Sequence, residues 1–368
     1  MKTRPTAEHR SKLQTANRKG AIAVTAAILM IPLLGMVAFA IDYGYLLTKR
    51  ANLQRAADSA ALAAVRDLVP ADDGSQDASA VRAAVKQYAA SNINDVTGFT
   101  VLDSDIEIGR YDPTTVYGNF TILNTGTFDT VRVTLRRDAN ANSPVPLFFA
   151  RIFGMVDSDV RATGTAVLQK GSILEPGVGV LPFSIPKADW DATNPGDIWS
   201  IYGDGSMEDD SGGTIPGNWG TSDIGDANNS TSDISDQILN GLRQKDLDAL
   251  HADGRIPTST HIDSSIASYL NGDPGLSSGM KAAVQAIHGQ TRLIPVYDTV
   301  TAHGANLEFH VVGWAVCRVI DSNWNGAKKT YVKVKKSFAY DGVLRPQADL
   351  GDTTKVIDGA FTSAVLVE

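Results

Sequence analysis

The sequence predicts an α+β protein in which one N-terminal transmembrane helix continues into a long outer helix, followed by an α/β head and a sheet-dominated α+β domain. Three observations support this fold class. Residues 21–41 contain no charged side chain. Residues 42–65 lack proline and are rich in alanine and leucine, which favours an uninterrupted helix. Beyond residue 65, short strand patterns and amphipathic helical patterns are separated by polar turns.

The uncharged segment 21–41 is long enough to cross a membrane. A helix of about 20 apolar residues, rising about 1.5 Å per residue, spans the roughly 30 Å hydrocarbon core of a bilayer. Within lipid the backbone has to satisfy its own hydrogen bonds, so Pro32 and Gly35 are expected to bend this helix without ending it. Asp42 is expected where the helix leaves the membrane on its outer side, because a carboxylate within the bilayer is energetically unfavourable.

The tail of residues 1–20 sets the expected orientation. It holds six basic residues and one acidic residue, so the positive-inside rule keeps it in the cytoplasm. A cleaved secretory signal is the alternative, since residues 38–40 read Ala-Phe-Ala, but the apolar run exceeds the roughly 7–15 residues usual for a signal. In both interpretations the rest of the chain is exported. The membrane anchor is the preferred interpretation.

A row of small apolar side chains follows the outer helix, 42–65, at steps of three and four residues. Gln54 and Asp58 lie beside this seam. Small side chains permit very close helix packing. The seam packs either on the protein's own head or on another subunit, which would make a homo-oligomer, and both alternatives remain open. Its members are Leu46, Leu53, Ala57, Ala60 and Ala64.

Composition excludes several function classes. The chain has 33 Lys plus Arg and 41 Asp plus Glu, and six basic and one acidic of these belong to the tail, so the remainder carries a net charge of −13. This acidic balance argues against nucleic acid as a partner. Cys317 is the only cysteine and lies in an apolar run, so we expect a buried thiol and no disulfide, zinc or redox site.

The first extracytoplasmic domain is predicted at 66–170. A helix carrying Val81 and Val85 is expected after a polar turn, with Asp77 or Ser79 as its cap. The stretch 145–154 is too apolar to lie in water, and forms either a short core helix or a membrane-facing or partner-facing patch. Strands are predicted at 100–108, 119–123, 131–136 and 161–169.

The second domain is predicted at 171–368. Helices are expected after Asp233 and after Ser277 or Ser278, with these residues as caps. Strands are expected at 293–300, 307–319 and 329–338. Because residues 309–319 are apolar on both faces, they should form a central strand.

Catalytic signals are weak. Residues 275–279 fit G-x-S-x-G, but Asn-Gly-Asp-Pro precedes them where a nucleophile elbow needs an apolar strand. Helix capping by serine explains the same residues, so a periplasmic hydrolase using Ser277 is a remote alternative. His303 and His310 lack a carboxylate pattern for a metal site and are expected to be ordinary polar residues. No catalytic residue, metal or cofactor is predicted.

Two binding hypotheses remain open. The acidic segment 204–210 could hold calcium, although it lacks the alternating spacing of an EF-hand loop, and a solvated acidic loop is the default. Exposed tryptophans suit the faces of sugars, so a surface or periplasmic module that recognises a glycan or polymer is the alternative function, although burial in a core is the more frequent role of tryptophan. The residues concerned are Trp190, Trp199 and Trp219.

Residues 19–65 also combine these features in a distinctive order, in which the apolar run begins at Gly20, ends at Asp42 and is followed from Leu53 by LQRAADSAALAA. In order and spacing this segment resembles the N-terminal module of TadG-like tight-adherence (Tad, or Flp) pilus-assembly proteins. The resemblance implies a non-enzymatic protein of the bacterial inner membrane that assists assembly or anchoring of Flp-type pili, with pilus or other envelope proteins and the lipid bilayer as partners. Its periplasmic or extracellular head would be pilin-like in outline. The residues expected to serve the anchor and helix packing are Gly20, Pro32, Gly35, Asp42, Leu53, Gln54, Ala57, Asp58, Ala60 and Ala61.

Residues 179–183, 216–220, 294–298 and 312–315 are similar to the extracytoplasmic portion often attached to such N-termini, a portion without assigned chemistry. Two departures limit the resemblance. A prepilin-peptidase substrate would carry glutamate five residues after the cleavage-site glycine, where this chain has Thr25, so processing as a pilin subunit is not expected. Residues 263–267, DSSIA, break the Asp-x-Ser-x-Ser motif of a von Willebrand A metal site.

Overall fold

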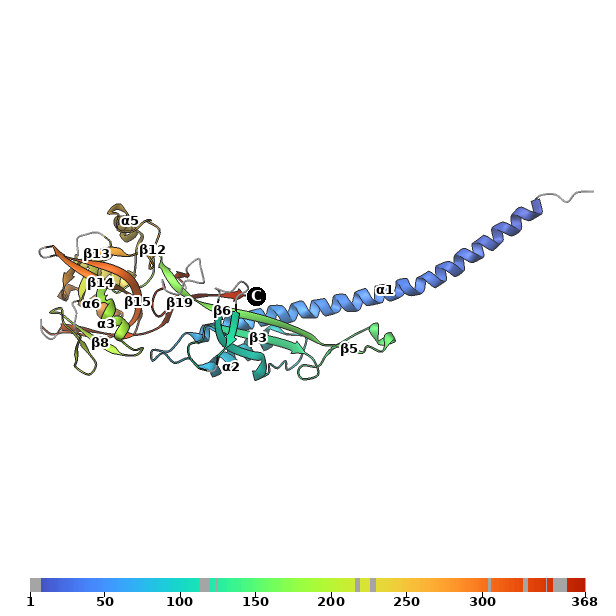
Figure 1. Cartoon of the computed structure of the whole chain (residues 1–368), viewed down its shortest axis with the longest axis horizontal. Helices are drawn as coiled ribbons and strands as arrows, with labels where there is room; N and C mark the ends of the chain where they lie inside the picture. Colours follow the sequence, from blue (N-terminus) through green and yellow to red (C-terminus); the bar gives the residue numbers. More distant parts are fainter. Residues whose placement is uncertain are drawn as a thin grey trace, which may run out of the picture.

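The computed structural model shows an elongated molecule, with a long helix at one end and two sheet-containing domains at the other (Figure 1). This combination confirms the predicted α+β class. Residues 1–7 of the tail and 216–218 of the second domain, both part of the predictions above, lie outside the described residues. The structure describes residues 8–112, 119–123, 125–215, 219–225, 230–303, 306–326, 330–341, 343–346 and 356–367.

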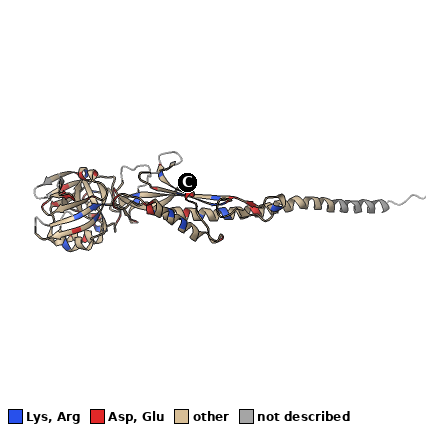
Figure 2. Ribbon diagram, turned by 90° about the horizontal axis from the view of Figure 1, so that it is seen from below, with Lys and Arg blue, Asp and Glu red and all other residues tan. Residues whose placement is uncertain are grey.

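Helix α1 (Glu8–Ala64) runs without interruption through Pro32 and ends in the 3₁₀ turn η1 (Val65–Leu68). From Ile22 onward it is long and apolar enough to cross a membrane, with a mean hydropathy of 2.5 in an 18-residue window of which none is buried. Figure 2 shows this stretch of α1 without charged residues, whereas charges appear where the helix reaches the first domain. One helix thus has an apolar exposed part and a part packed on the protein.

The first domain combines the C-terminal part of α1 and helix α2 (Ala78–Asn92) with a sheet of strand order β17-β19-β6-β3-β1-β2. All neighbours in it pair antiparallel except β17 and β19. Small side chains of α1 allow the two helices and the sheet to share one core. The strands are β1 (Ile106–Asp112), β2 (Asn119–Ile122), β3 (Thr130–Arg137), β6 (Val160–Leu174), β17 (Ala339–Tyr340) and β19 (Ala360–Val367).

The second domain contains a closed ring of strands. Because β14 pairs with both β7 and β15, the order β15-β13-β11-β7-β14 returns to its start. Strands β16, β8, β9 and β10 continue outward from β15. Residues 309–319 lie in β15, which has neighbours on both sides, so the predicted central strand is confirmed. The bounds are β7 (Phe183–Pro186), β8 (Ile198–Tyr202), β9 (Met207–Asp209), β10 (Thr214–Ile215), β11 (Gly220–Asp223), β13 (Ser268–Pro274), β14 (Thr291–His303), β15 (Asn306–Trp324) and β16 (Thr330–Lys336).

Short helices cover this ring of strands. Ser230, and not the predicted Asp233, caps helix α4, since its side chain accepts a hydrogen bond from the Asp233 backbone N–H at 3.2 Å. Ser277 caps the 3₁₀ turn η4, in agreement with the capping interpretation of its motif. The helical elements are α3 (Lys187–Ala192), α4 (Thr231–Asn240), α5 (Gln244–Ala252), η4 (Ser278–Met280) and α6 (Lys281–Ala286).

Strand β6 joins the two domains. Its first part pairs with β3 and β19, and its last residues pair with the short strands β12 (Ile262–Asp263) and β18 (Arg345–Pro346) of the second region. The boundary expected between residues 170 and 171 therefore lies inside a continuous strand. Strand β19, which follows the second domain in sequence, returns to the sheet of the first, so β6 and β19 both connect the two domains (Figure 1).

Candidate functional site at the outer membrane boundary

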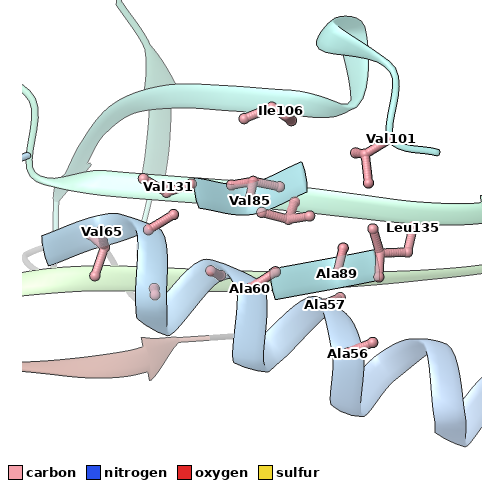
Figure 3. Close-up of a cluster of buried hydrophobic side chains, with 14 of the residues drawn as sticks. Ala56, Ala57, Ala60, Val65, Val85, Ala89, Val101, Ile106, Val131 and Leu135 are labelled. Atoms are coloured by element: carbon pink, nitrogen blue, oxygen red, sulfur yellow. The ribbon is translucent and has the colours of Figure 1, made fainter. Parts of the chain in front are cut away.

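The seam of α1 packs on the protein's own first domain. Leu53 is 2 % exposed, and Ala57, Ala60 and Ala61 are fully buried. Figure 3 shows Ala57 and Ala60 facing side chains from α2 and from the sheet, among them Ala89. Of the two alternatives for the seam, the structure therefore shows packing within the chain, and any homo-oligomer would need another face of the helix.

Gly164 of β6 sets how closely the seam approaches the sheet. A Cβ atom placed on this glycine would lie 2.7 Å from the backbone of Ala57 and Asp58. That separation is shorter than any ordinary carbon contact, so only glycine fits between strand and helix here. The sequence pattern identified the small residues on the helix but not their partner on the strand, because a lone glycine in a strand pattern has several causes.

Gln54 and Asp58 tie the helix to β6. Gln54 Nε2 donates to Asp58 Oδ1 at 2.8 Å and to the backbone carbonyl of Thr163 at 2.7 Å. Strand β19 pairs with β6 only as far as Thr165, so Gln54 contacts the part of β6 that β19 does not cover. Gln54 therefore links α1 to β6, and Asp58 orients the Gln54 amide from the same helix.

Asp42 binds a loop that lies more than a hundred residues away in sequence. Its carboxylate is 3 % exposed. One oxygen accepts from the backbone N–H of Phe148 at 2.9 Å, and the other from those of Phe149 at 2.9 Å and Ala150 at 2.7 Å. Burial alone raises the pKa of Asp42, but the three N–H donors outweigh it and hold the pKa below its ordinary value. Asp42 is therefore an ionised clamp at the end of the apolar helix.

The loop that Asp42 binds is one turn of 3₁₀ helix, η3 (Ala150–Phe153), between the paired strands β4 (Val145–Pro146) and β5 (Asp157–Ser158). Phe148 stacks edge-on against Tyr45 of α1, with ring centroids 5.1 Å apart. Of the alternatives for 145–154, the core helix is wrong, because every residue of η3 is at least partly exposed. The stretch is a patch on the surface.

Most of the residues between Ile22 and Ile41 are exposed. Gly20 and Pro32 lie inside α1, and a Cβ placed on Gly35 would have no atom within 4 Å outside its own helix backbone. This open surface is what a helix surrounded by lipid requires.

The other candidate residues have structural contacts. Trp190, Trp199 and Trp219 are at most 4 % exposed, since they fill the core of the second domain and do not line a surface. The Ser277 hydroxyl accepts from Thr231 and from the backbone of Gly279, which is a capping arrangement. In the acidic segment 204–210, the side chains of Asp204 and Asp209 accept hydrogen bonds from the turns they begin.

His310 lies 2.7 Å from Asp298, a pairing across β14 and β15 that the sequence did not reveal. Within the described residues, no group of three or more potential metal ligands comes together.

A second polar cluster, missed at the sequence level, holds the two domains together. Asp72 lies in the turn after η1, and its carboxylate is 3.1 Å from the guanidinium of Arg318, 3.6 Å from Lys335 Nζ and 2.5 Å from the Ser337 hydroxyl. Burial raises the pKa of Asp72, but Ser337 and the two cations outweigh it and lower the pKa. An aspartate in a polar turn carries no sequence signal for such a contact.

Two family models match the chain. Residues 20–67 match the Flp pilus-assembly TadE/G-like family, and residues 49–166 match the Tad-like Flp pilus-assembly family. The first match confirms the resemblance seen in the apolar run and the seam. The second extends it over α2 and the first sheet, and residues 167–368 lie outside both. Comparisons with curated proteins and with solved structures gave no match.

Proposed function

We propose that this chain, which carries a TadE/G-like module, is a non-enzymatic membrane protein that assists the assembly or anchoring of Flp-type pili. It acts as a single-pass protein of the bacterial inner membrane. Residues 1–20 lie in the cytoplasm, and both domains lie in the periplasm or beyond. The partners are the lipid bilayer and pilus or other envelope proteins.

The observation that carries this proposal is the continuity of α1. One helix exposes apolar side chains between Ile22 and Ile41 and, without a break, buries Leu53 and Ala57 in the first domain. A head attached in this way is held at a fixed distance from the bilayer and cannot swing about a flexible linker. Such an arrangement suits a protein that positions other components above a membrane.

Deletion and complementation test the proposal. Deleting the gene is expected to reduce surface pili and adherence, and the full chain is expected to restore both. A version in which residues 1–41 are replaced by a cleavable signal is expected to be exported and folded yet fail to restore them, because it lacks the anchor. A reporter fused after Val65 is expected outside the cytoplasm.

The Ser277→Ala variant separates this role from the remote hydrolase alternative. We expect it to complement fully, because Ser277 caps a short 3₁₀ turn. Normal pilus number in the deletion strain, or full complementation by the unanchored version, would overturn the proposal.

A further inference from the structure

We propose that the loop at residues 147–156, here called the apolar loop, is a second membrane contact that inserts into the outer interface of the bilayer spanned by α1. This inference goes beyond the role in pilus assembly and rests on the part of the proposed function that places α1 across a bilayer. It depends on the chemistry of the loop, on the hydrogen bonding of its backbone and on its position beside α1.

The apolar loop is too exposed and too apolar to face water alone. It reads LFFARIFGMV, with Arg151 as its one charged residue. Ile152 is 80 % exposed and Phe153 is 72 % exposed. Phe148, Met155 and Val156 are each more than half exposed as well. A contiguous apolar patch of this kind on a protein surface marks a contact with a membrane or a partner.

The backbone of the apolar loop suits a medium of low polarity. Lipid tolerates an irregular turn only where the peptide groups already have partners. Asp42 accepts three consecutive N–H groups, from Phe148 to Ala150. Four more amides, those of Leu147, Ile152, Gly154 and Met155, donate to carbonyls within the loop at 3.0–3.2 Å. The amides of the loop therefore already have the partners that insertion into a lipid interface requires.

The position of the apolar loop indicates that lipid is what it contacts. Asp42 directly follows the apolar run, so its bonds to Phe148 place the base of the loop at the end of the lipid-exposed surface of α1. On that surface Phe39 is 67 % exposed and Ile41 is 47 % exposed. The tip projects beside α1 in the direction of the helix N-terminus (Figure 1). The loop therefore continues an apolar surface that already requires lipid.

Charge supports the same assignment. Arg151 lies in the turn and is exposed, so its apolar stem can lie along the acyl chains while its guanidinium contacts lipid phosphates. Asp157 and Asp159 follow the loop on the side of the domain, where they remain in water. Two contacts, one helix and one loop, would fix the tilt of the head relative to the membrane plane, which a single helix leaves variable.

The test uses the full chain reconstituted alone in liposomes. An environment-sensitive fluorophore is attached to Phe153→Cys and, as the matched control, to Leu239→Cys on α4, where the native residue is 49 % exposed in the distal domain. Native Cys317 is fully buried and stays unlabelled, which the wild-type chain verifies. Brominated lipids are expected to quench the label at 153 several-fold more than the label at 239, whereas aqueous iodide is expected to quench only 239.

A double variant, Ile152→Asp with Phe153→Asp, extends the test with the label moved to Met155→Cys. It is expected to lose lipid quenching while its thermal unfolding is unchanged, because both replaced side chains are exposed. Quenching of residue 153 by iodide and not by brominated lipid would overturn the proposal. So would protection from both quenchers, which would show a second copy of the chain covering the loop.

Discussion

Asp42 satisfies three backbone amides with one carboxylate, so replacing it should loosen a loop far away in sequence. In detergent, Asp42→Ala is expected to increase hydrogen exchange at Phe148 to Ala150 and to speed trypsin cleavage after Arg151, because the three N–H groups lose their acceptor. Asp157→Asn, an exposed change at the other end of the loop, is the matched control. Equal exchange in both variants would contradict the clamp.

Asp72 makes the contact between the domains dependent on pH. Its pKa is lowered in the folded protein, so its contribution is complete above the unfolded pKa of about 3.9 and disappears as the pH falls through the folded value. At pH 7, Asp72→Asn is expected to lower the free energy of unfolding by about 2 kcal/mol, the scale of hydrogen bonds to a charged group.

The difference between wild type and Asp72→Asn should shrink as the pH falls through the lowered pKa of the folded protein, where the native carboxyl becomes protonated as well. Chemical denaturation of both proteins over a series of pH values measures this difference. Asp73, whose side chain accepts hydrogen bonds from Ser75 in its own turn, provides the control Asp73→Asn. A difference between wild type and Asp72→Asn that does not change with pH would show that charge plays no part.

Individual residues were predictable from sequence only where the cause is local. The sequence places Asp42 at the membrane boundary because it ends an uncharged run. It offers Asp77 or Ser79 as the cap of α2, and the structure shows that Asp77 accepts hydrogen bonds from the first amides of that helix. The partners of Asp42 and Asp72 were not predictable, since they lie 106 to 265 residues away along the chain. Spacing rules describe neighbours on one helix or strand and contain no information on such pairs.

At the scale of elements, the close contact of α1 and β6 depends on Gly164. Gly164→Ala is expected to destabilise the first domain by roughly 1–3 kcal/mol, because the added Cβ would clash with the backbone of α1, which cannot move away as a flexible side chain could. Gly313→Ala in β15 is the matched control, since a Cβ there has no atom within 4 Å. Equal stability of the two variants in thermal unfolding would contradict the proposed fit.

Most helices and strands could be predicted from the sequence, whereas the pairing of the strands could not. Alternation of apolar and polar side chains marked β3, and apolar residues on both faces marked β15 as central. Nothing in that alternation indicated that β14 would pair on both sides and close a ring, because register and neighbours depend on long-range contacts. For residues 145–154 the sequence leaves a core helix and a surface patch as alternatives, because an apolar run alone does not show whether its side chains are exposed.

At the scale of the whole molecule, the first domain depends on the last strand of the chain. Ending the chain before Ala360 removes β19 and leaves one edge of β6 without its partner. This truncation is expected to make residues 42–170 of the shortened chain more sensitive to trypsin, although the truncation lies some 190 residues beyond them. Matched digestion of the full chain supplies the control, and equal resistance would show that the first domain folds without β19.

The return of β19 also determines how the protein would respond to mechanical tension. A domain joined by one linker would reorient freely under a pull, since nothing else resists the movement. Here the force would enter the first sheet through two antiparallel neighbours, β6 and β19, whose ladder of hydrogen bonds shares the load. A pull on the distal domain would therefore load both strands together, and the first domain would resist reorientation.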